Sequence, residues 1–169
     1  MKDRKRNRIV DFDYGSNNLY FVTSCTKDKI CWFGEIDNGR MMLNEMGETA
    51  QRQWGWLLNK YPYLKSHAFV VMPNHIHGVL EINRDLLNDR TGRDLSLQPQ
   101  LKIKSLSELM GAYKTTTSKQ IHLLGCNDFA WQRSFYDNII RNTESYTKIV
   151  EYITDNPVNW DEDRFNENI

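Results

Sequence analysis

The sequence LKSHAFVVMPNHIHGVLEI, residues 64–82, holds two runs of apolar and β-branched side chains that are separated by Pro73 and Asn74. Runs of this composition predict β-strands, and a Pro-Asn pair between them predicts a tight turn. We therefore expect an antiparallel hairpin at this point of the chain. His75 and His77 interrupt the second strand of that hairpin, which is otherwise largely apolar.

Strand and helix patterns alternate along the rest of the chain. Apolar side chains recur at helical spacing after Asn44, which is a candidate N-cap, and Ser105 with Glu108 three residues later is typical of a capping box. The expected elements are a strand at 19–26, a helix at 43–60, the two strands of the hairpin, a helix at 105–123, a strand within 129–141, and a helix from 143 that ends near Pro157.

This order of elements predicts an α+β fold of the ferredoxin-like (RRM-like) type, in which an antiparallel sheet carries its helices on one face. The second face of the sheet would then be open. In nucleic-acid-binding proteins of this architecture, a single strand lies on that open face.

The chain is expected to form a single domain over residues 1–169, since this length is within the usual range of one domain. Its expected subdivisions are a basic N-terminal arm at 1–15, a mobile polar insertion at 84–100 and an acidic tail at 161–169. The 22 basic and 22 acidic residues cancel in the total, but their uneven distribution still allows a positive surface for DNA. The arm is either such a DNA contact or a solvated terminus.

The sequence contains no signal for a membrane. No apolar run approaches the roughly 20 residues that cross a bilayer, and the N-terminus lacks the apolar core of a signal peptide. We therefore expect a cytoplasmic protein. Its three cysteines lack C-x-x-C spacing, so they predict neither a structural zinc site nor a disulfide framework.

The two histidines of the hairpin are candidates for metal binding. Side chains alternate along a strand, so His75 and His77 point to the same side with their Cβ atoms about 6–7 Å apart. Two imidazoles in this arrangement can bind one cation, although an open sheet face also tolerates polar residues without any metal. A H-x-H pattern occurs in many unrelated metal sites, so a third ligand is needed.

The last expected helix offers that ligand and a nucleophile. Tyr152 and Asn156 are four residues apart and therefore share one face of the helix. The Asn156 amide oxygen suits Mg²⁺ or Mn²⁺, and a nearby cation or proton acceptor would make a phenol with a pKa near 10 an effective nucleophile. The alternative is structural: an Asn before a Pro commonly ends a helix, and a Tyr is commonly a core residue.

Two motifs in order resemble those of a known family, the HUH single-tyrosine transposases of the insertion-sequence-two-hundred kind, and within it the REP-associated branch. His75, Ile76 and His77 match the His-hydrophobic-His motif, and residues 131–160 (WQRSFYDNIIRNTESYTKIVEYITDNPVNW) are similar to the W-Q…I-R-N…Y-I-x-x-N-P signature of the branch. With LSELMGAYKTTTSKQI, the resemblance spans about residues 20–160.

The resemblance implies an HUH endonuclease fold and a DNA transposase that acts in DNA transposition and recombination. Such an enzyme cleaves and rejoins single-stranded or hairpin DNA through a covalent 5′-phosphotyrosine. Tyr152 would be the nucleophile, His75 and His77 would act in catalysis as ligands of a divalent cation, Mg²⁺ or Mn²⁺, and Asn156 would be the third ligand. Relatives of the transposon-borne kind work as dimers, so a homodimer is a further expectation.

Other side chains are candidates for DNA binding. Cationic side chains bind phosphates, whereas aromatic and amide side chains can stack on or pair with unpaired bases. The candidates are Lys114, Lys119, Arg133 and Arg141 for phosphates, and Trp131, Gln132 and Tyr136 for bases. Each of them has an ordinary core or surface role as its alternative.

Three alternatives to the main hypothesis stay open at this point. Tyr136 and Tyr146 compete with Tyr152 as the nucleophile, although Tyr146 lies six residues earlier and faces roughly the opposite side of the helix. The protein could bind hairpin DNA or RNA without cutting it. It could also be a metal-dependent hydrolase that activates water.

Overall fold

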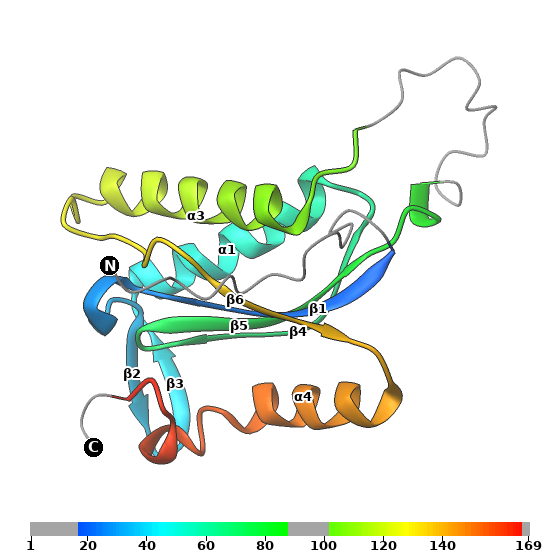
Figure 1. The fold of residues 1–169 in the computed structure, drawn as a ribbon. Helices are drawn as coiled ribbons and strands as arrows, with labels where there is room; N and C mark the ends of the chain where they lie inside the picture. Colours follow the sequence, from blue (N-terminus) through cyan, green and yellow to red (C-terminus); the bar gives the residue numbers. More distant parts are fainter. Residues whose placement is uncertain (1–16, 88–101, 167–169) are drawn as a thin grey trace, which may run out of the picture.

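Four antiparallel strands form the sheet on which the rest of the protein is built (Figure 1). The expected hairpin is confirmed: β4 (Leu64–Met72) pairs with β5 (His75–Ile82) across the Pro73-Asn74 turn. β1 (Asn18–Cys25) lies beside β5, and β6 (Tyr136–Ile140) completes the order β4-β5-β1-β6. This is the strand order of a ferredoxin-like sheet, in which the first strand of the sequence, β1, lies in the interior.

Two helices cover one face of the sheet and enclose the main core. They are α1 (Glu45–Lys60) and α3 (Leu106–Leu123), which pack against each other above the strands in Figure 1. Both begin as the sequence predicts: Asn44 accepts hydrogen bonds from the first turn of α1, and Ser105 with Glu108 forms a capping box. Capping satisfies backbone N–H groups that a helix start would otherwise leave unpaired.

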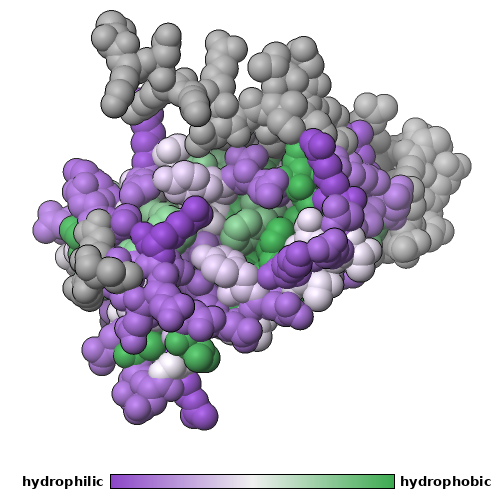
Figure 2. Space-filling view, turned by 60° about the horizontal axis from the view of Figure 1, so that its bottom comes forward, coloured by the Kyte–Doolittle hydropathy of each residue, from purple (hydrophilic) through white to green (hydrophobic). Residues whose placement is uncertain are grey.

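The third helix, α4 (Thr143–Asp155), lies against the opposite face of the sheet (Figure 1). The expectation that all helices share one face is therefore correct for α1 and α3 and wrong for α4. The physical reason is a second apolar cluster, in which Ile153 of α4 packs with Val79 and Ile140 on the strands. Seen from this side, hydrophilic residues cover most of the surface and surround limited hydrophobic patches (Figure 2).

A small second sheet was not anticipated from the sequence. β2 (Gly34–Asp37) and β3 (Arg40–Leu43) form a hairpin in a segment that reads only as rich in turns. Asn38 and Gly39 at its tip both have positive φ angles, 48° and 72°, as a two-residue hairpin turn of the primed type requires. The Asn-Gly pair was the available signal for this hairpin.

The computed structural model describes residues 17–87 and 102–166. The expected basic arm lies outside these residues, and the expected insertion and acidic tail fall only partly within them. The described part of the tail folds back toward the sheet through a short 3-10 helix, η3 (Trp160–Glu162). Within the described ranges, none of the helices has the length and apolar character needed to cross a bilayer.

Candidate active site

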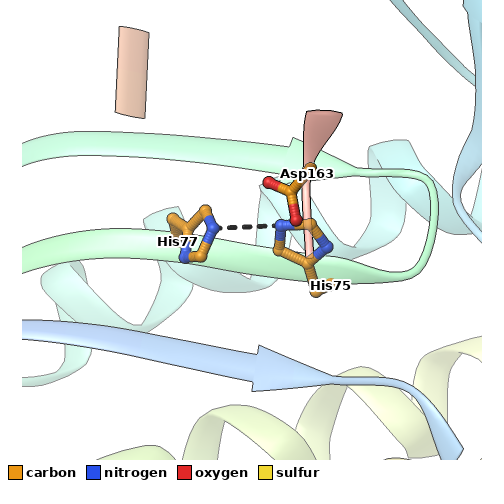
Figure 3. A group of neighbouring side chains, drawn as sticks. All are labelled: His75, His77 and Asp163. Carbon is orange, nitrogen blue, oxygen red and sulfur yellow. Dashed lines mark hydrogen bonds between the residues drawn. The ribbon is translucent and has the colours of Figure 1, made fainter. Parts of the chain in front are cut away.

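The imidazoles of His75 and His77 lie side by side on β5 (Figure 3). The contact of His77 with Tyr152 places them on the face of the sheet that α4 covers. Their Nε2 atoms are 3.0 Å apart, and both side chains are fully buried. The strand alternation expected from the sequence therefore holds. Thr23 of β1 is the pairing partner of both His77 on β5 and Tyr136 on β6, so these three residues form one row across the sheet.

Asp163 joins the two histidines from the segment that follows η3 (Figure 3). One ligand atom from each of His75, His77 and Asp163 lies within 4.8 Å of the others. Among residues 17–87 and 102–166, no other group of three such side chains comes close enough to hold a metal ion. Sequence reasoning missed Asp163 because it placed this residue in an acidic tail, and no local periodicity links it to the histidines.

The C-terminal end of α4 brings Tyr152 and Asn156 to the same place. The Tyr152 hydroxyl is 3.2 Å from His77 Nε2 and 3.4 Å from Asp163 Oδ2, within a single chain. Asn156, at the C-cap of α4, donates a hydrogen bond from Nδ2 to Asp163 Oδ2 at 2.8 Å. The side chains that the sequence predicts as nucleophile and ligands therefore meet at one point, with Asp163 added.

Burial controls the protonation of this site. It lowers the pKa of His75 to about 4, although the Asp163 carboxylate opposes the effect. Burial and then the neighbouring His75 lower the pKa of His77 well below its usual value. Partial burial and then Asp163 raise the pKa of the Tyr152 phenol. At neutral pH both imidazoles are thus uncharged, as metal ligands must be, and Tyr152 retains its proton.

The donor set fits a divalent cation. It combines two neutral imidazoles with a carboxylate and an amide, which are nitrogen and oxygen donors suited to Mn²⁺ or, less fully, to Mg²⁺. The Asn156 Oδ1 atom is buried and accepts no hydrogen bond. A buried acceptor without a partner costs about 1–3 kcal/mol, and a cation held by Asp163 and the histidines would satisfy it.

Aromatic rings enclose the pair of histidines. Phe165 lies 4.7 Å from the His75 ring and 5.8 Å from the His77 ring, measured between centroids. Phe21 of β1 lies 5.3 Å from His77 and meets Tyr152 edge to face at 6.1 Å. These rings keep water from the imidazoles while leaving Tyr152 40% exposed.

The two competing tyrosines occupy different positions. Tyr146 lies near the start of α4, where its hydroxyl is 3.1 Å from Nδ1 of His67 rather than beside the histidine pair. Tyr136 is 49% exposed and lies at the rim of the site, with the Arg164 guanidinium 5.9 Å from its ring. Tyr152 is thus the tyrosine whose hydroxyl contacts His77.

Five of the seven candidates for DNA binding line one groove, of about 830 Å³, between α3 and the segment that precedes β6. They are Lys114, Lys119, Trp131, Gln132 and Arg133. Two of these have clear roles inside the protein, because Trp131 packs in the core and the Lys114 ammonium donates to the backbone carbonyls of Gln132 and Arg133. Lys119 and Arg133 are exposed, as is the sixth candidate, Arg141.

Backbone hydrogen bonds connect one edge of this groove to the strand that carries the histidine pair. Gln132 N donates a hydrogen bond to the carbonyl of Cys25, and Cys25 is the pairing partner of His75. One strand therefore separates the groove's edge from the metal ligands. The seventh candidate, Tyr136, lies on the site's side of the sheet.

Comparisons with known proteins bear on the fold and the family. No family model matches the chain. A protein of Haemophilus influenzae, described as uncharacterized, is 34% identical over 166 residues, which cover 95% of this chain and 92% of that protein. A solved structure of the REP-associated tyrosine transposase bound to a REP hairpin superposes with a TM-score of 0.59 at 20% identity, covering 95% of this chain and 74% of the other.

The structural match confirms the fold that the sequence resemblance implied, an antiparallel α+β sheet of the HUH transposase type. The sequence match extends over nearly the whole of both proteins. The chain therefore belongs to the same family as its Haemophilus influenzae relative, and its fold is that of the REP-associated tyrosine transposase.

Proposed function

We propose that this protein is a metal-dependent transposase that cleaves and rejoins single-stranded or hairpin DNA through a covalent bond to Tyr152. One observation carries the proposal: within one chain, the Tyr152 hydroxyl contacts both a neutral histidine of a buried pair and a buried carboxylate. The fold shared with a REP-associated tyrosine transposase supports the choice of DNA as the substrate.

The chemistry assigned to Tyr152 is attack on a phosphodiester. The phenol oxygen bonds to phosphorus while the bond from phosphorus to the 3′ oxygen breaks, which leaves a 5′-phosphotyrosine and a free 3′-hydroxyl. The phenol proton passes to Asp163, whose Oδ2 accepts the Tyr152 hydrogen bond at 3.4 Å, and the departing 3′ oxygen takes up a proton from solvent. Attack by another 3′-hydroxyl then reverses these changes and joins the strands without ATP, because the energy of the phosphodiester is kept in the tyrosine ester.

Four side chains would hold the divalent cation: His75, His77, Asp163 and Asn156. When bound, Mg²⁺ or Mn²⁺ would polarise the phosphoryl oxygen under attack. The His pair contributes neutral nitrogen donors, and the unpaired Oδ1 of Asn156 supplies an oxygen donor. The hydrogen bond from Asn156 Nδ2 to Asp163 orients the carboxylate toward the site.

We assign the DNA path to the groove beside α3 and the rim of the site. Lys119, Arg133 and Arg141 are exposed cations and are proposed to bind phosphates. Gln132 and Tyr136 are proposed to contact unpaired bases, since Tyr136 is half exposed at the rim of the site, one strand away from the histidines. Lys114 and Trp131 are proposed to act indirectly, by holding the groove's wall in shape.

A covalent-trapping experiment tests the proposal. The protein is incubated with Mn²⁺ and a labelled pool of hairpin oligonucleotides that carry random single-stranded flanks, and adducts are separated on a denaturing gel. Wild type should give a labelled adduct, and Tyr152→Phe should give none because the attacking oxygen is absent. Tyr146→Phe is the matched control, since it removes a hydroxyl from the same helix outside the site, and it should retain the adduct.

The other outcomes separate the rival functions. An adduct that persists in Tyr152→Phe and disappears in Tyr146→Phe would refute the assignment of the nucleophile. Hairpin binding without cleavage by any variant would identify a non-catalytic binding module. Multiple turnovers without an adduct would identify a hydrolase that uses activated water.

A further inference from the structure

The amide of Asn74, in the turn between β4 and β5, has only one orientation that satisfies its surroundings. Asn74 is 1% exposed, and its Nδ2 atom lies 3.0 Å from the carbonyl oxygen of Lys29 and 2.8 Å from that of Phe165. Carbonyl oxygens only accept hydrogen bonds, so the NH₂ group must face them. Oδ1 of Asn74 therefore points the other way, toward His75.

This orientation determines which nitrogen of His75 carries the proton. Oδ1 of Asn74 lies 2.8 Å from Nδ1 of His75, and an amide oxygen cannot donate. Nδ1 of the neutral ring must therefore be protonated, which leaves a lone pair on Nε2. That lone pair points toward His77 and the place assigned to the cation.

The proton of His77 follows from the same network. At 3.0 Å, the two Nε2 atoms need one proton between them, and His75 cannot supply it. His77 must therefore carry its proton on Nε2, which the Tyr152 oxygen at 3.2 Å can share. Nδ1 of His77 is then an acceptor, and the hydroxyl of Thr23, 2.7 Å away and 1% exposed, donates to it.

We propose that Asn74 and Thr23 are positioning residues with different tasks in binding the cation. Asn74 holds His75 permanently in the tautomer whose Nε2 can bind a metal. His77 must change tautomer, and Thr23 permits the change because its hydroxyl can accept as well as donate. The proton on Nε2 of His77 is lost to solvent, one is gained on Nδ1, and the Thr23 hydroxyl rotates to accept it. The inference rests on the proposed metal site, but its first test does not need a metal.

The first test reads the tautomers of the metal-free protein by long-range ¹H–¹⁵N NMR of ¹⁵N-histidine-labelled protein, which contains four histidines. His75 should carry its proton on Nδ1 and His77 on Nε2. Asn74→Ala should release His75 into a mixture of tautomers. Asn74→Asp loses the two hydrogen bonds to the carbonyls of Lys29 and Phe165 but keeps an acceptor beside Nδ1, so it should retain the Nδ1 proton. Thr26→Val is the control, because the Thr26 hydroxyl bonds to the backbone carbonyls of Ile30 and Asn74 and not to the His75 ring.

The second test adds the metal alone. On addition of Zn²⁺, a diamagnetic probe, the proton of His77 should move to Nδ1 while that of His75 stays in place. Asn74→Ala should weaken Mn²⁺ binding by about 10- to 100-fold, the usual effect of removing a partner that orients a ligand. Thr23→Val should weaken it as well, and Thr23→Ser should restore it, because serine keeps the hydroxyl.

The outcomes distinguish this inference from the proposed function. If His75 keeps its Nδ1 proton in Asn74→Ala, or if Thr26→Val alters the tautomer equally, the role of Asn74 is refuted whether or not metal binds. If the metal-free tautomers are as stated but neither Zn²⁺ nor Mn²⁺ binds, the proposed metal site fails while the control of His75 by Asn74 stands. Metal binding with His77 still protonated on Nε2 would refute the role of Thr23.

Discussion

Lowering the pH should destabilise the protein through its buried histidines, even in the absence of metal. In an unfolded chain an imidazole has a pKa of about 6.5, whereas burial lowers that of His75 to about 4. Between these two values the unfolded chain binds a proton that the folded protein does not. Stability is therefore complete above pH 6.5 and is lost as the pH falls toward 4.

The size of the effect follows from the two pKa values. Each pKa unit corresponds to about 1.4 kcal/mol, so His75 alone should lower the free energy of unfolding by about 3 kcal/mol between pH 7.5 and pH 4. His77 adds to this in the same direction, because its pKa is also lowered by burial. A loss of this size is a large part of the 5–15 kcal/mol typical of a folded domain.

Urea denaturation at a series of pH values, with EDTA to remove metal, measures this loss. The comparison is between wild type and His75→Gln, since groups away from the histidine pair titrate alike in both. Removing His75 also relieves part of the lowering of the His77 pKa, which changes the variant in the same direction. The variant should lose about 3 kcal/mol less than wild type over the same pH interval. Val71→Ala is the control: it opens a cavity in the same sheet, where Val71 is 5% exposed, and should lower stability at every pH in parallel.

One result would refute the reasoning. If His75→Gln and wild type lose the same free energy of unfolding between pH 7.5 and pH 4, the histidine at this position is not held neutral by burial. A stability that rises as the pH falls would show instead that Asp163 stabilises a protonated His75.

Two further predictions concern residues around the histidine pair. Gly78→Ala should lower the free energy of unfolding, measured by urea denaturation, by about 1–3 kcal/mol. A Cβ there would lie 2.9 Å from the ring of Trp54, which stacks on Phe69 and is held by a hydrogen bond to Ser66. An unchanged free energy of unfolding would contradict this. Asp163→Ala should weaken Mn²⁺ binding, measured by EPR titration, by at least about tenfold, since losing a ligand should weaken binding no less than losing a partner that orients one; equal or tighter binding would exclude Asp163 as a ligand.

Local patterns were sufficient to predict most of the fold. The β4-β5 hairpin, the caps of α1 and α3 and the alternation that brings His75 beside His77 all depend on neighbours in sequence. The β2-β3 hairpin depends on its neighbours too, but its Asn-Gly turn was not used. The face on which α4 lies could not be predicted in the same way, because an apolar stripe on a helix does not specify which side of a sheet it will cover.

In the candidate site, too, some features depend on local sequence and others on the tertiary structure. By itself, the sequence determined that His75 and His77 lie on one side of a strand and that Tyr152 and Asn156 share one face of a helix, since each pair depends on the period of a single element. The resemblance to a known family then related the two pairs. Only the tertiary structure decided that Asp163 completes the site and that Asn74 orients His75. Both contacts require the chain after η3 to fold back onto β5, and no local spacing encodes how segments about ninety residues apart come together.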